Sequence, residues 1–113
     1  MKKIIVFGAT GNIGAYFIDY CKTRLQDEYE IIAVGRKYTD YFEKNEIKYL
    51  QVDICNDSDF HKLPTKDVYA IVNLTGILPA YLQKYDPFIY VETNIKGSLR
   101  ILESVSYTHL TLP

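Results

Sequence analysis

Three glycines near the N-terminus have the spacing of a phosphate-binding turn. Gly8, Gly11 and Gly14 follow the apolar run Ile4–Phe7, which is typical of a buried strand, and residues 12–24 are typical of the helix that comes next. Gly8 permits a sharp exit from the strand, Gly11 lets the main chain approach a ligand, and Gly14 lets the helix lie close to the sheet. The N–H groups of the first helical turn and the helix dipole favour an anion, and a pyrophosphate fits there. These residues therefore predict a bound dinucleotide.

The spacing of these glycines also leaves a structural alternative open. It is G-x-x-G-x-x-G, whereas the commonest dinucleotide fingerprint is G-x-G-x-x-G, so the glycines could mark an ordinary turn between a strand and a helix. Their position favours the binding site, because the first strand–helix turn of an α/β pattern is where such folds bind phosphates.

Arg36 stands where the second predicted strand ends, in the segment Gly35-Arg36-Lys37. Where NAD is preferred, an acidic residue near this point accepts hydrogen bonds from the adenosine ribose hydroxyls. A guanidinium can instead pair with a 2′-phosphate and stack on adenine. The sequence therefore favours NADP over NAD as the cofactor. The alternative is that Arg36 and Lys37 form an ordinary solvated strand end.

Two further segments follow strands at the same predicted edge of the sheet. Asp53 could accept a hydrogen bond from the adenine amino group while Ile54 packs on the ring, and the alternative is a turn aspartate with a core isoleucine. Leu74, Thr75 and Gly76 close the fourth predicted strand at the carboxyl edge, where open α/β sheets bind ligands. Gly76 would let the backbone pass close to the nicotinamide ribose, or it belongs to a plain strand-to-loop turn.

The elements that must position these segments alternate between strands and helices. Apolar runs predict three further strands, over residues 30–34, 48–52 and 68–74. The polar stretch 36–46 allows one or two helical turns, and Asp57 or Ser58 could cap a short helix that runs to about Leu63, with Pro64 beyond it. This order predicts an α/β fold with a Rossmann-like, doubly wound parallel sheet, truncated after about four strands. Because the fourth strand would be an uncovered apolar edge, we expect the isolated chain to be marginally folded and prone to aggregation.

The last predicted helix has Asp86 as N-cap and Pro87 at its first position. An apolar stripe at helical spacing follows, formed by Val91, Ile95, Leu99 and Leu102. We therefore interpret residues 1–104 as the N-terminal part of a dinucleotide-binding domain. The pattern breaks at about residue 105, and residues 105–113 look like the in-frame translation of a transposon adapter used for sequencing libraries. The alternative for this tail is a natural loop plus the start of a fifth strand.

Composition excludes several classes of protein. A chain of 113 residues forms at most one small domain, and 48% hydrophobic with 24% charged residues is ordinary for a globular protein. The net charge is −1 with interspersed signs, so no nucleic-acid or anionic-membrane partner is expected. No apolar run is long enough to span a membrane. Cys21 and Cys55 fit no metal spacing and no disulfide framework, which favours a reducing, cytoplasmic location and predicts no metal site.

Taken together, the motifs resemble the N-terminal half of the extended short-chain dehydrogenase/reductase family, the NAD-dependent epimerases and dehydratases of nucleotide sugars. The resemblance covers essentially all of residues 2–104. The segments that carry it are Gly8-Ala9-Thr10-Gly11-Asn12-Ile13-Gly14, Asp53-Ile54, Asn73-Leu74-Thr75-Gly76 and Asn94-Ile95-Lys96-Gly97-Ser98. The resemblance implies that Thr10, Asn12 and Ile13 join the glycines in binding the cofactor, and that Thr93 or Asn94 faces the same site. From the residues alone, Gly97 in mid-helix indicates a close packing contact.

The chain departs from that family in lacking its catalytic Tyr-x-x-x-Lys pair. None of the eleven tyrosines has a lysine four positions later, and in the family this pair lies further along the chain. Its tyrosine acts as general acid and base, with a pKa lowered by the lysine. The resemblance thus implies an inactive N-terminal fragment of an NAD(P)-dependent enzyme that takes a hydride from a nucleotide sugar and that could be a homodimer at full length. The alternatives are an atypical NADP-binding regulator or scaffold, and a reductase acting on a flavin or quinone-like substrate.

Overall fold

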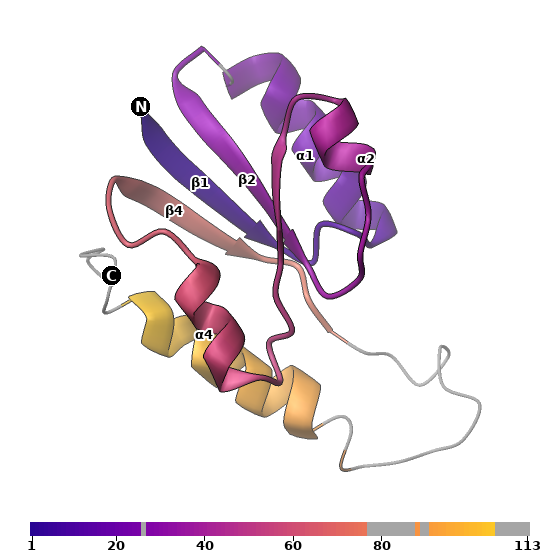
Figure 1. Ribbon diagram of the computed structural model, residues 1–113, viewed down its shortest axis with the longest axis vertical. Coiled ribbons are helices and arrows are strands. Elements are labelled where there is room, and N and C mark those ends of the chain that lie inside the picture. Colours follow the sequence, from indigo (N-terminus) through magenta and orange to yellow (C-terminus); the bar gives the residue numbers. More distant parts are fainter. Residues whose placement is uncertain (26, 77–87, 89–90, 106–113) are drawn as a thin grey trace.

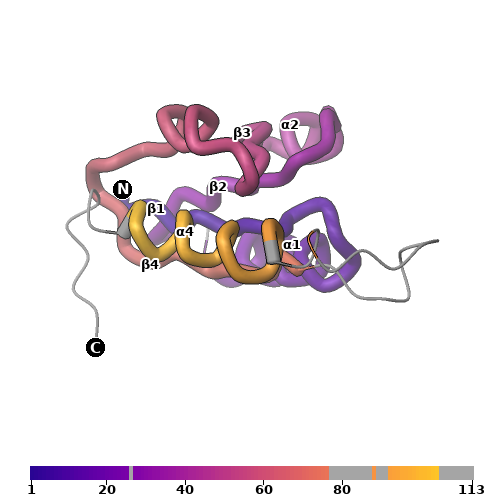
Figure 2. Tube along the Cα trace, turned by 90° about the horizontal axis from the view of Figure 1, so that it is seen from below, coloured from indigo at the N-terminus to yellow at the C-terminus, as the bar shows by residue number. Residues whose placement is uncertain are grey.

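Parallel strands form one sheet in the order β3-β2-β1-β4 within the part of the chain that the computed structural model describes, residues 1–25, 27–76, 88 and 91–105. The strands are β1 (Lys2–Phe7), β2 (Tyr29–Gly35), β3 (Lys48–Gln51) and β4 (Val68–Asn73). The helices are α1 (Asn12–Leu25), α2 (Tyr41–Lys44), the 3-10 helix η1 (Asp57–Lys62), the π-helix η3 (Val91–Gly97) and α4 (Ser98–Val105). Figure 1 shows this arrangement, and in Figure 2 β1 lies between β2 and β4. The predicted α/β fold with a doubly wound parallel sheet is confirmed.

The sheet is covered on both faces because successive side chains of β1 point to opposite sides. Ile4 and Val6 pack with residues of α1 and α2, whereas Ile5 and Phe7 pack with the other core, which includes residues beside η1 and on α4. All four side chains are buried, with at most 6% of their surface exposed. A strand buried on both faces reads as a continuous apolar run, which is why β1 was evident from the sequence.

The cap of η1 differs from its prediction. Asn56 is the N-cap, and its Oδ1 accepts a hydrogen bond from the Ser58 N–H at 3.1 Å. Asp57 and Ser58 therefore lie inside the helix, and the Asp57 carboxylate pairs with Arg100 of α4 instead of capping. The helix ends at Lys62 and the chain becomes extended at Leu63, as the following proline requires.

The apolar stripe predicted for the last helix is not the face that packs on the sheet, and the side chain of its first member, Val91, lies outside the described residues. Ile95, Leu99 and Leu102 are each more than half exposed, whereas Gly97 and Ile101 are buried. Gly97 has no side chain to hold the helix away, so that face makes the close contact. The predicted cap Asp86 and the following Pro87 lie outside the described residues, as does the tail from residue 106 onwards. None of the helices described is long and apolar enough to cross a membrane.

Candidate functional site

The turn between β1 and α1 is built around backbone contacts that exclude side chains at two of its glycines. Gly8 has φ +82°, and a Cβ on it would lie 2.6 Å from the carbonyl carbon of Leu74 and 2.9 Å from the nitrogen of Thr75. A Cβ on Gly14 would lie 2.1 Å from the Gly8 oxygen, so α1 packs against the turn itself and not only against the sheet. At Gly11 the nearest atom would be the Gly8 oxygen at 3.6 Å, which leaves space for a ligand. Gly8 and Gly14 thus have separate packing roles, with Gly14 contacting the turn, while the role of Gly11 toward a ligand stays a prediction.

The first turn of α1 follows Gly11 directly and carries backbone donors. Its hydrogen bonding begins with the Ala15 N–H, which donates to the Gly11 oxygen at 3.0 Å. The N–H groups of Asn12, Ile13 and Gly14 come before that bond, at the positive end of the helix dipole. Asn12 and Ile13 are exposed, with 74% of Ile13 accessible. The arrangement suits a phosphate or pyrophosphate group.

A cavity of about 220 Å³ at the carboxyl ends of the strands brings most of the predicted site residues together. Those that line it come from five segments that are separate in the sequence: Gly8, Thr10, Gly11, Arg36, Asp53, Ile54, Leu74, Thr75, Gly76 and Thr93. Asn12, Ile13 and Gly14 begin the adjoining helix and do not line the cavity. Asn94 does not line it either, although its Oδ1 would lie 3.7 Å from a Cβ on Gly76. Contact of these residues with a cofactor stays a prediction.

Five residues that line the cavity were not among the predicted site residues: Phe7, Val34, Gly35, Val52 and Cys55. The Cys55 N–H donates to Asp53 Oδ1 at 2.9 Å, and its Sγ lies 3.5 Å from Thr93 Oγ1. Its position directly after Asp53-Ile54 was the available signal. Gly35 ends β2 immediately before Arg36, and it is buried.

Asp53 and Ile54 have structural roles as well as a place in the cavity wall. Asp53 accepts the Cys55 bond and donates its own N–H to Asp59 Oδ2 at 2.9 Å, which makes it a turn aspartate. Ile54 is only 7% exposed and packs on Gly97, where an added Cβ would lie 2.5 Å from the Ile54 Cδ1. The alternative interpretation, a turn aspartate with a core isoleucine, is therefore correct for part of what these two residues do. A carboxylate can accept several hydrogen bonds, so Asp53 keeps the capacity to accept another one from a ligand.

Arg100 of α4 ties this wall to the last helix. Its Nε lies 2.5 Å from Asp57 Oδ1, and its Nη1 lies 3.1 Å from Glu92 Oε1 and donates to the Ile54 oxygen, also at 3.1 Å. The hydrogen bond to Asp57 raises the pKa of the Arg100 guanidinium, while desolvation opposes this. The clamp joins α4, η3 and the segment after β3, which are the elements around Ile54.

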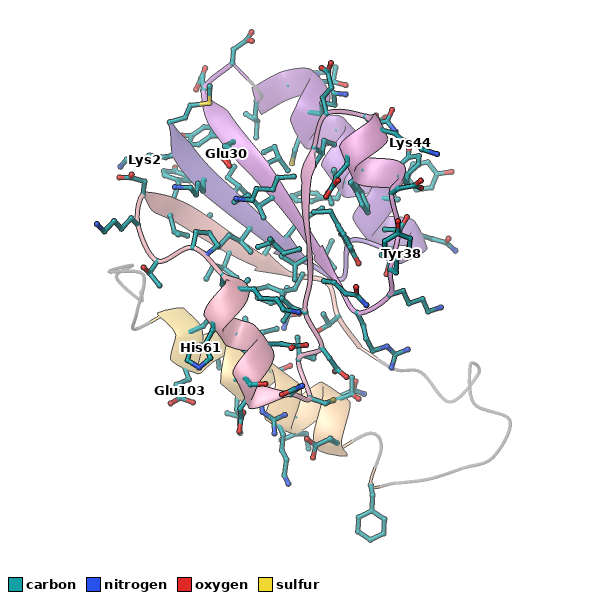
Figure 3. The ribbon with its side chains drawn as sticks, viewed as in Figure 1. Lys2, Glu30, Tyr38, Lys44, His61 and Glu103 are labelled. Atoms are coloured by element: carbon teal, nitrogen blue, oxygen red, sulfur yellow. The ribbon has the colours of Figure 1, made fainter. Side chains whose placement is uncertain are left out.

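A second cavity, of about 580 Å³, lies between η1, β4 and α4. Thr65, just before β4, and Ser104, near the end of α4, line it, as do His61 and Glu103, which Figure 3 labels. It shares no lining residue with the cavity at the glycine turn. The described residues contain no cluster of histidine, cysteine, aspartate or glutamate that could hold a metal ion.

Comparisons with known proteins give the same fold. The sequence model of the NAD dependent epimerase/dehydratase family matches residues 4–111. No curated protein sequence matches the chain. L-threonine dehydrogenase from Clostridium difficile is 23% identical, with a TM-score of 0.77, over 96% of this chain and 34% of its own. UDP-glucose 4-epimerase from Thermus thermophilus, solved with NAD, is 19% identical, with a TM-score of 0.72, over 93% of this chain and 34% of its own.

A third solved structure, dTDP-glucose 4,6-dehydratase from Bacillus anthracis in complex with NAD, is 23% identical, with a TM-score of 0.68, over 94% of this chain and 34% of its own. The chain therefore spans about a third of the length of these proteins. At such identities the likeness establishes the fold, so any functional assignment must come from the residues of the site.

Proposed function

The chain belongs to the NAD-dependent epimerase/dehydratase family, and from this premise we propose that it is the cofactor-binding portion of an NAD(P)-dependent oxidoreductase acting on a nucleotide sugar. The observation that carries the proposal is the cavity where the glycine turn meets the carboxyl ends of the strands. Four segments besides the glycine turn line this cavity, and an isolated glycine turn would not require them to do so.

The proposed assignment gives each segment one part of the cofactor. The backbone donors at Asn12–Gly14 hold the pyrophosphate, and Asp53 with Ile54 receives the adenine. Arg36 pairs with the 2′-phosphate of NADP, which is why we favour NADP over NAD. Gly76 and Thr93 lie toward the nicotinamide ribose.

The reaction itself depends on groups beyond the segments assigned above. When bound, the cofactor would accept a hydride from a sugar carbon, and a tyrosine and lysine supplied elsewhere in the full-length enzyme would handle the proton. Because the chain lacks that pair, we expect residues 1–113 to bind the cofactor without turnover. A measurable epimerase or dehydratase rate from this chain would contradict that expectation.

Binding can be tested separately from folding with Gly11→Ala. A Cβ at this position makes only an ordinary van der Waals contact, 3.6 Å from the Gly8 oxygen, so the variant should keep its thermal stability while it obstructs the pyrophosphate. We expect fluorescence or calorimetric titration to show NADPH binding to the natural chain and at least about tenfold weaker binding to the variant, a loss of ~1.4 kcal/mol. The matched control is Tyr20→Phe, which changes an exposed side chain of α1 that does not line the cavity. Failure of the natural chain to bind any nicotinamide dinucleotide, or equal binding by Gly11→Ala, would refute the site.

The absence of a Tyr-x-x-x-Lys pair among the eleven tyrosines also fits a second candidate, an NADP-binding regulator. The two candidates make different predictions about the residues that would follow this chain in its gene. A Tyr-x-x-x-Lys pair after a fifth strand, together with turnover of a nucleotide sugar, supports the enzyme, whereas NADP binding without that pair and without turnover supports the regulator.

A further inference from the structure

Strand β3 holds the main chain of β2 beyond the point where β2 ends. The Gly35 oxygen accepts a hydrogen bond from the Val52 N–H at 2.9 Å, which continues the parallel pairing of the two strands. The next oxygen, that of Arg36, accepts from Gln51 Nε2 at 3.1 Å. The oxygen after that, of Lys37, accepts from the Tyr49 hydroxyl. Three consecutive carbonyls thus accept hydrogen bonds from β3 and from Val52 directly after it. The last two bonds come from side chains of β3, and we call these two bonds the tether.

Tyr49 is itself well fixed for this role. It is only 9% exposed and its ring stacks on Phe42, with ring centroids 5.4 Å apart and an interplanar angle of 12°. Burial raises the pKa of the Tyr49 phenol, so the group stays protonated and can donate. The hydroxyl passes over Gly35, where a Cβ would lie 2.6 Å from it and 2.8 Å from Thr10 Cγ2. Because Gly35 has no side chain, the Tyr49 hydroxyl and the Thr10 side chain of the glycine turn can both lie close to its Cα.

The tethered carbonyls flank the residue proposed to read the cofactor. Arg36 is exposed and its side chain has many rotamers, whereas its own backbone and that of Lys37 are held on β3. In Figure 3 the label of Tyr38 marks the loop that continues from these two residues, whereas the labels of Lys2 and Glu30 mark the N-terminal ends of β1 and β2. Because the backbone is already ordered, pairing with a phosphate costs only the conformational entropy of the Arg36 side chain.

We propose that Tyr49 and Gln51 are positioning residues that set the preference for a 2′-phosphorylated nucleotide by holding the backbone at Arg36. This inference rests on the proposed function, because it assumes that Arg36 meets the 2′-phosphate. Neither Tyr49 nor Gln51 needs to touch the nucleotide. Their loss should therefore weaken discrimination and leave the common part of the binding energy unchanged.

The test compares 2′,5′-ADP with 5′-ADP, two probes that differ by the 2′-phosphate alone. Calorimetric titration of the natural chain should give a clear preference for 2′,5′-ADP. Tyr49→Phe and Gln51→Met each remove one donor at nearly constant volume, and we expect each to reduce that preference about three- to tenfold, the effect of one net hydrogen bond. The affinity for 5′-ADP should stay within about twofold, and thermal stability is recorded in parallel. Tyr20→Phe, an exposed hydroxyl on α1 away from the cavity, is the matched control.

The possible outcomes separate this inference from the proposed function. If the natural chain binds both probes equally, the NADP assignment of Arg36 fails. If it prefers 2′,5′-ADP and both variants keep the same ratio, the NADP assignment stands and the positioning role is overturned. If both affinities fall together in the variants, the tether only supports the fold, and the inference is also overturned.

Discussion

Replacing Gly14 by alanine should damage the fold of the turn before any ligand is considered. The new Cβ would lie 2.1 Å from the Gly8 oxygen and 2.9 Å from both the Gly8 carbon and the Ala9 Cα. These are backbone atoms, so no side-chain rotation relieves the overlap. Overpacking of this kind costs up to ~3 kcal/mol, while alanine gains ~1 kcal/mol in helix propensity over glycine. We expect a net loss of about 2 kcal/mol, which corresponds to a fall in Tm of about 8–16 °C for a domain of this size.

Thermal unfolding followed by circular dichroism measures this effect, and Gly11→Ala provides the control within the same turn. That substitution makes only an ordinary contact at 3.6 Å, so its free energy of unfolding should change by less than ~1 kcal/mol. A Gly14→Ala variant as stable as the natural chain would show that α1 can move off the turn, and the reasoning on close backbone approach would be wrong. Equal destabilisation by both substitutions would contradict the difference in steric contact between Gly11 and Gly14.

Further predictions concern the thiols, the Arg100 clamp and alkaline pH. Because Cys55 lines the cavity, NADPH should slow the alkylation of its thiol. Cys21 is buried, and burial raises the pKa of its thiol, so NADPH should not change its alkylation rate. Peptide mass spectrometry that finds both cysteines or neither of them protected would contradict this placement. Arg100→Met removes the contact with Asp57, so the urea midpoint should fall at low ionic strength and fall less at high salt, and an unchanged midpoint at low salt would mean that the clamp does not contribute to stability. Burial raises the pKa of the Tyr49 phenol in the folded chain. The contribution of this group to the free energy of unfolding is therefore fully present below the ordinary tyrosine pKa of about 10, and it is lost as the pH rises through the pKa of the folded state. Denaturant unfolding of Tyr49→Phe should therefore show a shallower loss of stability above that pH than the natural chain, and identical profiles would refute this.

Local patterns were sufficient for the sheet and for the glycine turn. The apolar run of β1 and the spacing of Gly8, Gly11 and Gly14 carry their information within a few residues, and the structure follows them closely. The meeting of distant segments at the cavity was also predictable, because the carboxyl ends of parallel strands share one edge. Contact of these residues with a cofactor stays a prediction.

Features that depend on long-range contacts could not be read from the sequence. Asp57 is a plausible cap by type, but its pairing with Arg100, 43 residues away, leaves that role to Asn56. The tether from Tyr49 to Lys37 requires the pairing register of β2 and β3, which the sequence does not fix. The sequence indicated a packing contact at Gly97 without its partner, and the structure identifies that partner as Ile54.

The contact between Ile54 and Gly97 means that the Ile54 side chain, which lines the proposed nucleotide pocket, also packs directly on the backbone of η3 at Gly97. Any attempt to retune base preference at position 54 meets this limit: a bulkier residue would press on the helix, and a smaller one would open the pocket onto it. Successful redesign of that wall would have to alter both partners at once.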